Sequence, residues 1–401
     1  MSNLEELKNK LCPNGVEFVK LGEVCKRQKG INITAFQMKE LNKDNGEIRI
    51  FAGGNTIANV NYEDIPNANI IDVPSIIVKS RGKVDFEYYN KPFTHKNELW
   101  SYSQNSDIIN LKFIYYYLCN NLDYFIKKSV RGAMPQIATP DTDNFEIPIP
   151  PLEVQDEIVR ILDPLTKDVN ELIDLLKKEQ ELRKKQYSYY RDKLLTFDEY
   201  TPKIKLGEVC EKIKNINWKK ENNISKKYID LSSVSREFHE IIDNEVKEVN
   251  SENAPSRARQ IIKINDILFG TTRPMLKRYC IVPEKYDDQI CSTGFCVLRI
   301  VNKDVLVNFI YHCLSTSNFY NFIEDNEQGT TYPAISDNIL KEYKIPFPPI
   351  EKQKEIVTIL DSLEKYYNNL QESLPAEIEK RKKQYEFYRD KLLTFEKNMS
   401  R

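Results

Sequence analysis

Two long stretches of the chain carry apolar residues at a seven-residue spacing. In the first stretch, Ile158, Leu165 and Leu172 fall seven residues apart. A second row, interrupted once by an aspartate, consists of Ile161, Leu175, Leu182 and Tyr189. Charged residues fill many of the positions between the rows, which is typical of the a/d seam of a coiled coil. The pattern predicts a long helix over residues 151–197, which begins after a Pro-Pro pair.

A second stretch, residues 349–401, repeats this pattern near the C-terminus. Its apolar positions are Ile356, Ile359, Leu363, Leu370 and Phe387. Proline lies within each stretch at a different place, Pro164 in the first and Pro375 in the second. Because proline inside a helix removes a hydrogen bond and clashes with the preceding turn, we expect a bend in each helix.

Two narrow seams of this length can cover each other. We therefore expect the helices to pair antiparallel as a spacer between two globular lobes, with separate packing of each helix on its own lobe as the alternative. At a rise of about 1.5 Å per residue, a helix over residues 151–192 spans on the order of 60 Å.

The remaining segments predict two lobes of mixed short strands and helices. Buried or alternating apolar runs predict strands at Ser75–Val78, Asp266–Phe269 and Phe295–Arg299. Aromatic-rich segments predict helices at Phe113–Lys128 and Asn308–Glu324. The predicted fold class is α+β: two α/β lobes separated by two long antiparallel coiled-coil helices.

The chain is an internal repeat. Lys20–Cys25 recurs as Lys205–Cys210, and residues 147–197 match residues 345–395 at 32 of 51 positions. The middles of the two copies share no convincing identity, so a nearly constant frame surrounds a variable insert. We divide the chain into a first lobe (1–150), a central helix (151–197), a second lobe (198–348) and a C-terminal helix (349–401), with pseudo-two-fold symmetry.

Positive charge is local to the lobes. The 401 residues contain 59 Lys and Arg against 60 Asp and Glu, a formal net charge of −1, which excludes a uniformly basic nucleic-acid coat. Residues 257–279, however, carry six basic residues and one acidic residue, and residues 79–96 carry five and two. Clusters of this kind neutralise phosphates, and Arg and Gln side chains can read guanine and adenine edges. For any one of these residues, a solvated surface charge is the alternative.

The candidate DNA-binding residues are Lys79, Arg81, Lys83, Lys127, Lys128, Arg131 and Gln136 in the first lobe and Arg257, Arg259, Thr271, Thr272, Arg273, Lys277 and Arg278 in the second.

Motifs for catalysis and metal binding are missing from the sequence. There is no phosphate-binding loop, no Asn-Pro-Pro-aromatic methyltransferase motif and no Cys-x-x-Cys pair among the eight cysteines. We expect free, mostly buried thiols, no metal site, and a core position for His312. No signal peptide and no 18-residue apolar run occur, so we expect a cytoplasmic protein that does not span a membrane.

The repeat resembles the specificity subunit of type I restriction–modification enzymes. The segments that carry the resemblance are residues 147–159 and 345–357 at the helix starts, 20–25 and 205–210 at the lobe starts, and Asp266–Pro274 with Cys291–Phe295 in the second lobe. The first lobe lacks the Thr-Thr-Arg-Pro form.

The resemblance implies a non-catalytic, DNA-binding subunit. Each lobe would read one half of a split sequence on double-stranded DNA, and the helices would set the gap, for which we expect about one turn of DNA. The helices would also dock two modification (methyltransferase) subunits that bring S-adenosylmethionine. Two restriction (translocase and nuclease) subunits, with ATP and Mg²⁺, are optional further partners. The alternatives are a duplicated DNA-modifying or DNA-cleaving enzyme and a scaffold that does not bind DNA.

Overall fold

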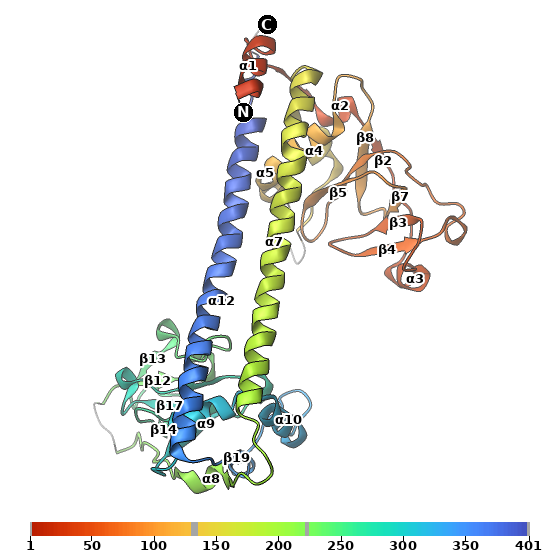
Figure 1. The fold of residues 1–401 in the computed structure, drawn as a ribbon. Helices are drawn as coiled ribbons and strands as arrows, with labels where there is room; N and C mark the ends of the chain where they lie inside the picture. The colour runs from red at the N-terminus through yellow and green to blue at the C-terminus, as the bar shows by residue number, and fades with distance from the viewer. Residues whose placement is uncertain (1, 130–134, 221–223, 399–401) are drawn as a thin grey trace. The chain divides into compact units, whose positions relative to one another are not determined.

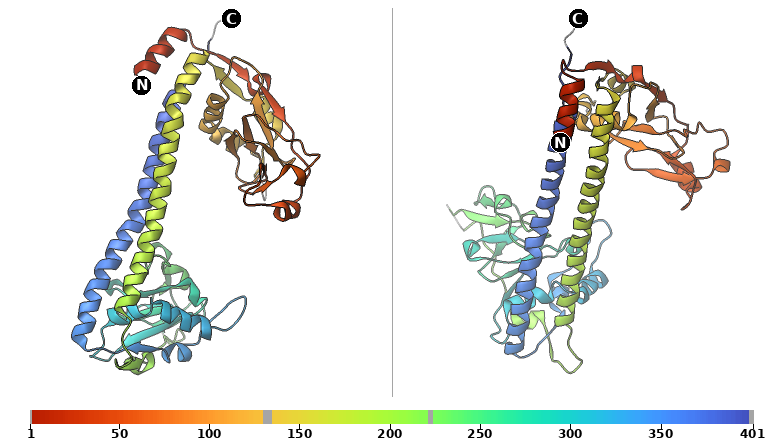
Figure 2. Two further views of the ribbon diagram at one scale, coloured as in Figure 1. Left: turned by 45° about the vertical axis from the view of Figure 1, so that its right-hand side comes forward. Right: turned by 45° about the horizontal axis from the view of Figure 1, so that its top comes forward.

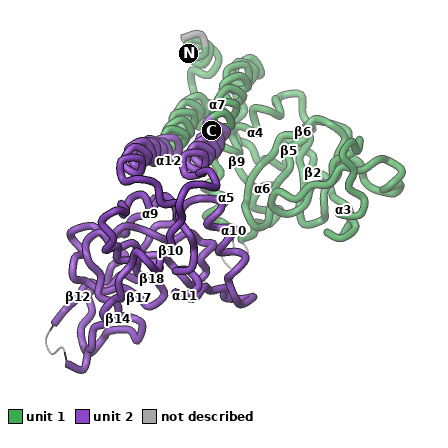
Figure 3. The backbone as a smooth tube through the Cα atoms, turned by 60° about the horizontal axis from the view of Figure 1, so that its bottom comes forward, with its two compact units in different colours: residues 1–175, 377–401 green, residues 176–376 purple. Residues whose placement is uncertain are grey.

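The computed structural model describes residues 2–129, 135–220 and 224–398, and the chain forms two compact units. Unit 1 contains residues 1–175 and 377–401, and unit 2 contains residues 176–376 (Figure 3). Each unit therefore combines one lobe with part of each long helix. Because lobe and helix group together in this division, the expected boundaries at residues 150, 197 and 348 remain predictions.

A short antiparallel ladder joins the start and the end of each lobe. In unit 1, β1 (Glu17–Lys20) pairs with β9 (Glu146–Ile149). In unit 2, β10 (Lys203–Lys205) pairs with β19 (Lys344–Pro346). Each ladder leads directly into a long helix, so the lobe is anchored where that helix begins.

The first sheet has the same strand order in both lobes, although the inserts share no convincing sequence identity. In the first lobe the order is β2 (Cys25–Gln28), β8 (Trp100–Gln104), β5 (Ser75–Lys79) and β6 (Asp85–Tyr89). In the second lobe it is β11 (Cys210–Glu211), β18 (Phe295–Ile300), β15 (Ile267–Gly270) and β16 (Tyr279–Ile281). All neighbouring strands in these sheets are antiparallel, and the three predicted strands are confirmed.

The second sheet repeats as well, with one addition. It contains β4 (Ile57–Val60), β3 (Ile48–Phe51) and β7 (Phe93–His95) in the first lobe. It contains β13 (Lys247–Val249), β12 (Lys226–Ile229), β17 (Ile290–Ser292) and β14 (Ala258–Ile261) in the second. In each lobe the strand second in this order pairs antiparallel on one side and parallel on the other. Where β14 pairs with β17, the described residues of the first lobe have a single antiparallel bridge between Ile71 and Phe93 of β7.

Each predicted aromatic helix is two helices. They are α4 (Leu111–Asn120) with α5 (Leu122–Lys128), and α9 (Val307–Cys313) with α10 (Ser317–Asn326). The first pair is broken at Asn121, whose backbone leaves the helical region, and the second at Thr316, whose hydroxyl accepts a hydrogen bond from the Phe319 amide. The prediction of unbroken helices was wrong because it followed apolar content and missed these capping residues.

Short helices complete the lobes (Figure 1). They are α1 (Ser2–Leu11), α2 (Leu21–Val24), α3 (Ala35–Leu41), α6 (Thr139–Asp143), α8 (Leu206–Val209) and α11 (Asp337–Lys341). Single 3₁₀ turns lie at Tyr62–Asp64, Leu231–Ser233, Asp243–Glu245, Pro274–Leu276 and Glu284–Tyr286.

The long helices are α7 (Leu152–Leu194) and α12 (Ile350–Leu393). Both helices continue through Pro164 and Pro375, so neither proline ends its helix, and the expected bends stay predictions. Within each unit the helices lie side by side (Figure 2). In unit 1 the Thr166 and Tyr385 hydroxyls lie 2.8 Å apart. In unit 2 Gln180 donates to Gln371 at 2.8 Å, and Tyr187 stacks on Tyr367, which confirms antiparallel pairing.

The seam between the helices is displaced by one residue from the predicted rows. Leu175, Leu182 and Tyr189 are more than half exposed. Between residues 162 and 187, the less exposed positions of α7 include Leu162, Thr166, Val169, Ile173, Leu176, Gln180, Arg183 and Tyr187. The same positions recur 198 residues later in α12, as Leu360, Glu364, Tyr367, Gln371, Leu374, Ile378, Arg381 and Tyr385. Several of these are polar, so apolar spacing alone predicted the neighbouring rows in this part of the helices, although Ile158 and Ile356 of the predicted rows are buried.

One buried glutamine fastens each long helix to its lobe. Gln155 is fully buried; its side chain accepts from the Asn110 amide and donates to the carbonyls of Ile108 and Pro150. Gln353 repeats all three bonds with Leu306, Asp304 and Pro348. A glutamine in each copy thus fixes the junction between the variable lobe and the constant helix.

Candidate nucleic-acid interface

The first lobe brings two predicted residues together where β5 ends. The Gly82 amide donates to the Pro135 carbonyl at 2.9 Å, and the Ile137 amide donates to the Ser80 carbonyl at 3.0 Å. This pairing places Arg81 opposite Gln136, and both side chains are exposed. We call residues 80–82 with 135–137, and their counterparts in the second lobe, the strand-end junctions. The first junction presents a guanidinium and a carboxamide next to each other.

The second lobe has the same junction where β15 ends. The Arg273 amide donates to the Pro333 carbonyl at 2.7 Å, and the Ile335 amide donates to the Thr271 carbonyl at 3.0 Å. Thr272 lies opposite Ala334. The second strand-end junction thus consists of residues 271–273 with 333–335. It keeps the proline of the first junction but has Thr272, Arg273 and Ala334 in place of Arg81, Gly82 and Gln136.

The two junctions share an unusual backbone conformation. Gly82 has φ +81°, and Arg273, at the equivalent place, has φ +50°. Glycine adopts this left-handed region freely, whereas other residues rarely do. Lys277, four residues later, has φ +56°. Strained residues cluster at functional sites, so the second junction is a candidate for recognition rather than a neutral turn.

Two aromatic rings hold the cations of the second junction. The Arg273 guanidinium lies 4.4 Å from the ring centre of Tyr332, which is 68% exposed. The Lys277 ammonium lies 4.3 Å from the ring centre of Tyr320, and burial lowers the pKa of Lys277. Cation–π contacts of this kind orient long side chains that would otherwise move freely. The sequence analysis missed both tyrosines, because nothing in their spacing relates them to the basic residues.

Two other predicted residues of the second lobe serve the fold. Thr271 is buried, and its hydroxyl donates to the Gly294 carbonyl at 2.9 Å. Arg278 is half-buried; its Nε finds no hydrogen-bond partner among the described residues, and burial lowers the pKa of its guanidinium. The Nε of Arg278 is buried and the Thr271 hydroxyl is already used, so neither atom offers a donor at the surface.

Ion pairs change the membership of the two charge clusters. Lys79 pairs with Glu87 at 2.7 Å, and Lys263 pairs with Asp288 at 3.0 Å. Among the described residues, the predicted site residues without an acidic partner are Arg81, Lys83, Lys127, Lys128, Arg257, Arg259, Arg273, Lys277 and Arg278. Arg131 lies outside the described residues. Within the cluster of the second lobe, five described cations between residues 257 and 278 are therefore left without an acidic partner.

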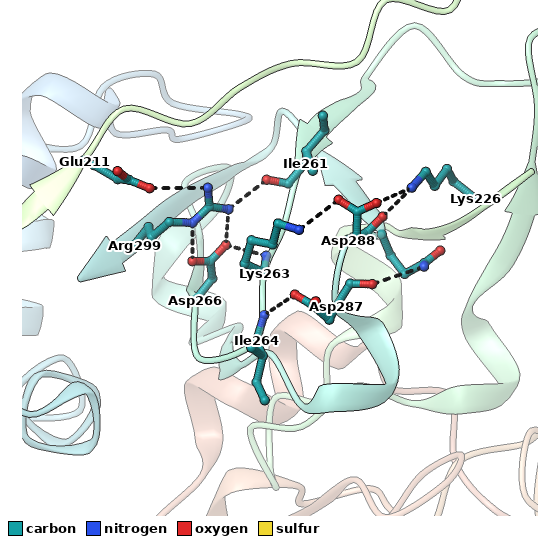
Figure 4. A network of polar contacts seen from close by, with 10 residues as sticks. Glu211, Lys226, Ile261, Lys263, Ile264, Asp266, Asp287, Asp288 and Arg299 are labelled. Carbon is teal, nitrogen blue, oxygen red and sulfur yellow. Dashed lines mark hydrogen bonds and ion pairs between the residues drawn. The ribbon is translucent and has the colours of Figure 1, made fainter. Parts of the chain in front are cut away.

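A buried ion pair lies at the start of the strand that leads to the second junction. Arg299 donates to both carboxylate oxygens of Asp266 at 2.8 and 2.7 Å, and Asp266 is 1% exposed (Figure 4). Figure 4 also shows Glu211 on the far side of Arg299 and Asp288 between two lysines. Because Asp266 directly precedes β15, this pair fixes the start of the strand whose end carries Thr272 and Arg273.

Other titratable groups are part of the core. His312 is fully buried, as predicted, and its Nε2 lies 2.7 Å from a carboxylate oxygen of Asp361. Glu364 lies in the same cluster and accepts from the Tyr311 hydroxyl at 2.8 Å, while His312 Nδ1 is buried without a hydrogen-bond partner among the described residues. All eight cysteines are free and five are buried, as expected; burial raises the pKa of Cys25 and Cys210 to about 12. Among the described residues, no helix has the length and apolarity needed to cross a bilayer.

Comparisons with known proteins agree with the repeat. A family described as "Type I restriction modification DNA specificity domain" matches residues 13–184 and again residues 199–380. The type I restriction enzyme EcoR124I/EcoR124II specificity subunit of Escherichia coli is 30% identical over 330 residues, covering 78% of this chain and 77% of that protein. The S subunit of a type I system from Mycoplasma genitalium superposes with a TM-score of 0.46 and 17% identity over 94% of this chain and 95% of that chain. The HsdS subunit from Thermoanaerobacter tengcongensis is 34% identical with a TM-score of 0.41, over 46% of this chain and 47%, less than half, of that one.

Proposed function

The chain belongs to the type I restriction modification DNA specificity family, and on that premise we propose that each lobe reads one half of a bipartite, asymmetric DNA sequence. It is the DNA specificity subunit of a type I restriction–modification system and works in a complex with other subunits and DNA. In this family the specificity subunit is non-catalytic and holds no cofactor, since the cofactors reside on the modification and restriction subunits.

One observation carries the proposal for two half-sites. Both lobes form the same strand-end junction, yet the first presents Arg81 and Gln136 where the second presents Thr272, Arg273 and Ala334. Two copies of one frame with different polar groups suit two different DNA half-sites. In the first lobe, the carboxamide can bind the N6 and N7 edge of adenine and the guanidinium can bind guanine. In the second lobe, the guanidinium of Arg273 favours guanine.

The other exposed cations suit the DNA backbone. Lys83, Lys127 and Lys128 in the first lobe, and Arg257 and Arg259 in the second, have exposed side chains. Such residues bind phosphates and fix the register of the protein on the duplex without reading sequence. On this assignment, sequence is read at the junctions and affinity comes from the surrounding lysines and arginines.

The paired helices have a separate role in the proposal. We assign to α7 and α12 the gap between the half-sites, about one turn of DNA, and the docking of two modification (methyltransferase) subunits that bring S-adenosylmethionine. Two restriction subunits with ATP and Mg²⁺ can join the complex. The proposed location is the cytoplasm, where these partners meet DNA.

Methylation mapping tests this function. In a strain that carries the complete system, methylated adenines are expected in one bipartite motif with a fixed gap. Adding one heptad to α7 and one to α12 at equivalent positions, so that the pairing is kept, is expected to change the gap and leave both half-sequences intact. A motif without a gap, an unchanged gap in the longer chain, or methylation by the purified chain alone would each contradict the proposal.

A further inference from the structure

The N-terminal helix α1 occupies a groove between α7 and α12 in unit 1. Leu4 belongs to the buried core together with Leu392 and Leu393. Leu7 and Leu11 border the same core. These three leucines repeat at positions i, i+3 and i+7, which is one face of a helix. Ile161, Leu165 and Phe395 also pack against this core. The helix α1 is therefore an amphipathic helix whose leucine face covers an apolar groove, and Figure 1 shows it at the C-terminal end of α12.

Two polar contacts fix α1 in that groove. The Lys8 ammonium donates to the carbonyls of Leu392 at 2.8 Å and Thr394 at 3.2 Å, at the C-terminal end of α12, and lies 4.2 Å from the Phe395 ring centre. Helix ends leave carbonyls without partners, and a cation there is favourable. Glu5 completes the fit with a 3.5 Å ion pair to Lys391.

Unit 2 contains the same groove, and none of the described helices fills it. A groove of about 560 Å³ lies where α7 ends, and its lining includes the counterparts, 198 residues earlier or later, of the residues around α1. These counterparts are Lys193 for Lys391, Leu194 for Leu392, Thr196 for Thr394, Phe197 for Phe395, Ile359 for Ile161 and Leu363 for Leu165. The second copy of the repeat has no segment equivalent to α1, because the aligned positions form the end of α7 itself.

We propose that the unit 2 groove binds an amphipathic helix of a partner subunit that carries the pattern of α1. The inference rests on the proposed function in one respect, that partner subunits dock on this chain. The lining specifies the occupant: three leucines at i, i+3 and i+7, an acidic residue at i+1 for Lys193, and a lysine at i+4 for the carbonyls of Leu194 and Thr196. Among the described residues, none donates to those two carbonyls.

A second copy of this chain is a poorer occupant than a partner subunit. The α1 of each chain already fills its own groove in unit 1. If α1 moved to the unit 2 groove of another chain, its own groove in unit 1 would be left open, so no apolar contact would be gained. The exchange would also replace an intramolecular contact, which has a high effective concentration, by an intermolecular one. A helix from a different subunit gains the contact without that loss.

A peptide of residues 2–11, acetylated and amidated, tests the groove on the full chain. We expect saturable binding at one site per chain, followed by fluorescence anisotropy of a labelled peptide. Ile359→Glu is expected to weaken binding at least about tenfold, because it places a charge in the apolar lining. Ile242→Glu is the matched control, since Ile242 is 39% exposed, close to the 40% of Ile359, and lies in the second lobe outside the lining and outside both long helices. A peptide with Lys8→Met should also bind more weakly.

The same chains are then mixed with purified modification subunit. Ile359→Glu is expected to lower the affinity for the modification subunit, and the peptide is expected to compete with that subunit, while Ile242→Glu leaves the affinity unchanged. If both variants bind the peptide equally, or if the unaltered chain does not bind it, the proposal that the unit 2 groove binds a helix is wrong. Peptide binding with unchanged subunit affinity overturns the partner assigned to it. If the unaltered chain binds neither modification subunits nor DNA, the proposed function is wrong. The peptide titration then still tests whether the unit 2 groove binds a helix.

Discussion

The two lobes keep the same sheets and junctions but differ in what supports and lines them. At the start of β5 the first lobe pairs Ser75 with Ser103, both buried. At the equivalent place the second lobe has Asp266 and Arg299 in a buried ion pair. At the junction itself, Gly82 in one lobe corresponds to Arg273 in the other. The same backbone frame therefore accepts either neutral or charged side chains, both at the buried start of the strand and at the exposed junction. A module whose DNA specificity varies requires this tolerance.

Removing one partner of the buried ion pair should produce the largest difference between the lobes. Arg299→Met leaves the Asp266 carboxylate buried without its cation, and we expect a loss of about 3–5 kcal/mol in the stability of the second lobe. Ser103→Ala in the first lobe should cost about 1 kcal/mol. Hydrogen exchange of β15 and β18 in the full chain, with β5 and β8 as the internal reference, measures both.

A double variant controls for the ion pair. Asp266→Ser with Arg299→Ser installs the first lobe's pair in the second lobe, and it should recover much of the lost protection because no charge remains buried. If Arg299→Met increased hydrogen exchange no more than Ser103→Ala does, the ion pair between Asp266 and Arg299 would not stabilise the second lobe.

Acid should lower the stability of the second lobe through His239. Burial lowers the pKa of this side chain from 6.5 to about 4, and its ring stacks on Tyr279 at 4.0 Å. A lowered pKa means that the folded lobe disfavours the charged form, so its stabilising effect is present above pH 6.5 and is lost as the pH falls toward 4. The loss amounts to about 3 kcal/mol at most.

Each lobe contains one tryptophan, which allows the pH effect to be measured separately. Urea unfolding at pH 7 and pH 5 is followed by Trp218 in a chain with Trp100→Phe. His239→Phe keeps the stack on Tyr279 and should flatten the pH dependence of the second lobe only. The first lobe keeps its own dependence, because burial also lowers the pKa of His95. An unchanged pH profile in His239→Phe would refute the assignment.

The strand-end junctions predict matched changes in specificity. Arg273→Gly installs the residue of the first lobe at a left-handed position, so the fold is kept while the guanidinium is lost. Gln136→Ala installs the residue of the second lobe, Ala334, in the first. We expect each change to cost about 1–3 kcal/mol at one base pair, roughly 10- to 100-fold in affinity. In methylation maps the two variants should relax different halves of the motif and leave the gap unaltered. Relaxation of the same half by both would contradict the comparison.

The sequence predicted the frame better than the contacts. The repeat followed from matching segments in the two halves of the chain. The two long helices and the three strands followed from apolar residues at short, regular spacing. The helix seam did not, because Thr166, Gln180 and Gln371 occupy it while Leu175 and Leu182 face outward. Apolar periodicity marks a buried face only where that face is apolar, and this seam depends partly on polar pairs.

The candidate site was predictable as a set of residues but not as a geometry. Arg81 and Gln136 meet across a bridge between segments 55 residues apart, and no local signal specifies such a contact. The repeat held one usable clue, since Pro135–Ile137 matches Pro333–Ile335 at the offset of the constant frame. Charge counting missed ion pairs formed with residues outside the counted window, such as Lys263 with Asp288.

The smallest expected effect separates two lysines of the first lobe. Lys79 is neutralised by Glu87 at 2.7 Å, whereas Lys83 is exposed and has no acidic partner among the described residues. Only a free cation releases a counterion when it meets a phosphate, so Lys83→Met should reduce the slope of log affinity against log salt by about 1. Lys79→Met should leave the slope nearly unchanged, although both variants remove one positive charge. Binding titrations across salt concentrations, with the complete complex on its own DNA site, measure both slopes. Equal slopes for the two variants would mean that net charge alone attracts DNA and that the ion pairs within the lobe do not select which cations reach it.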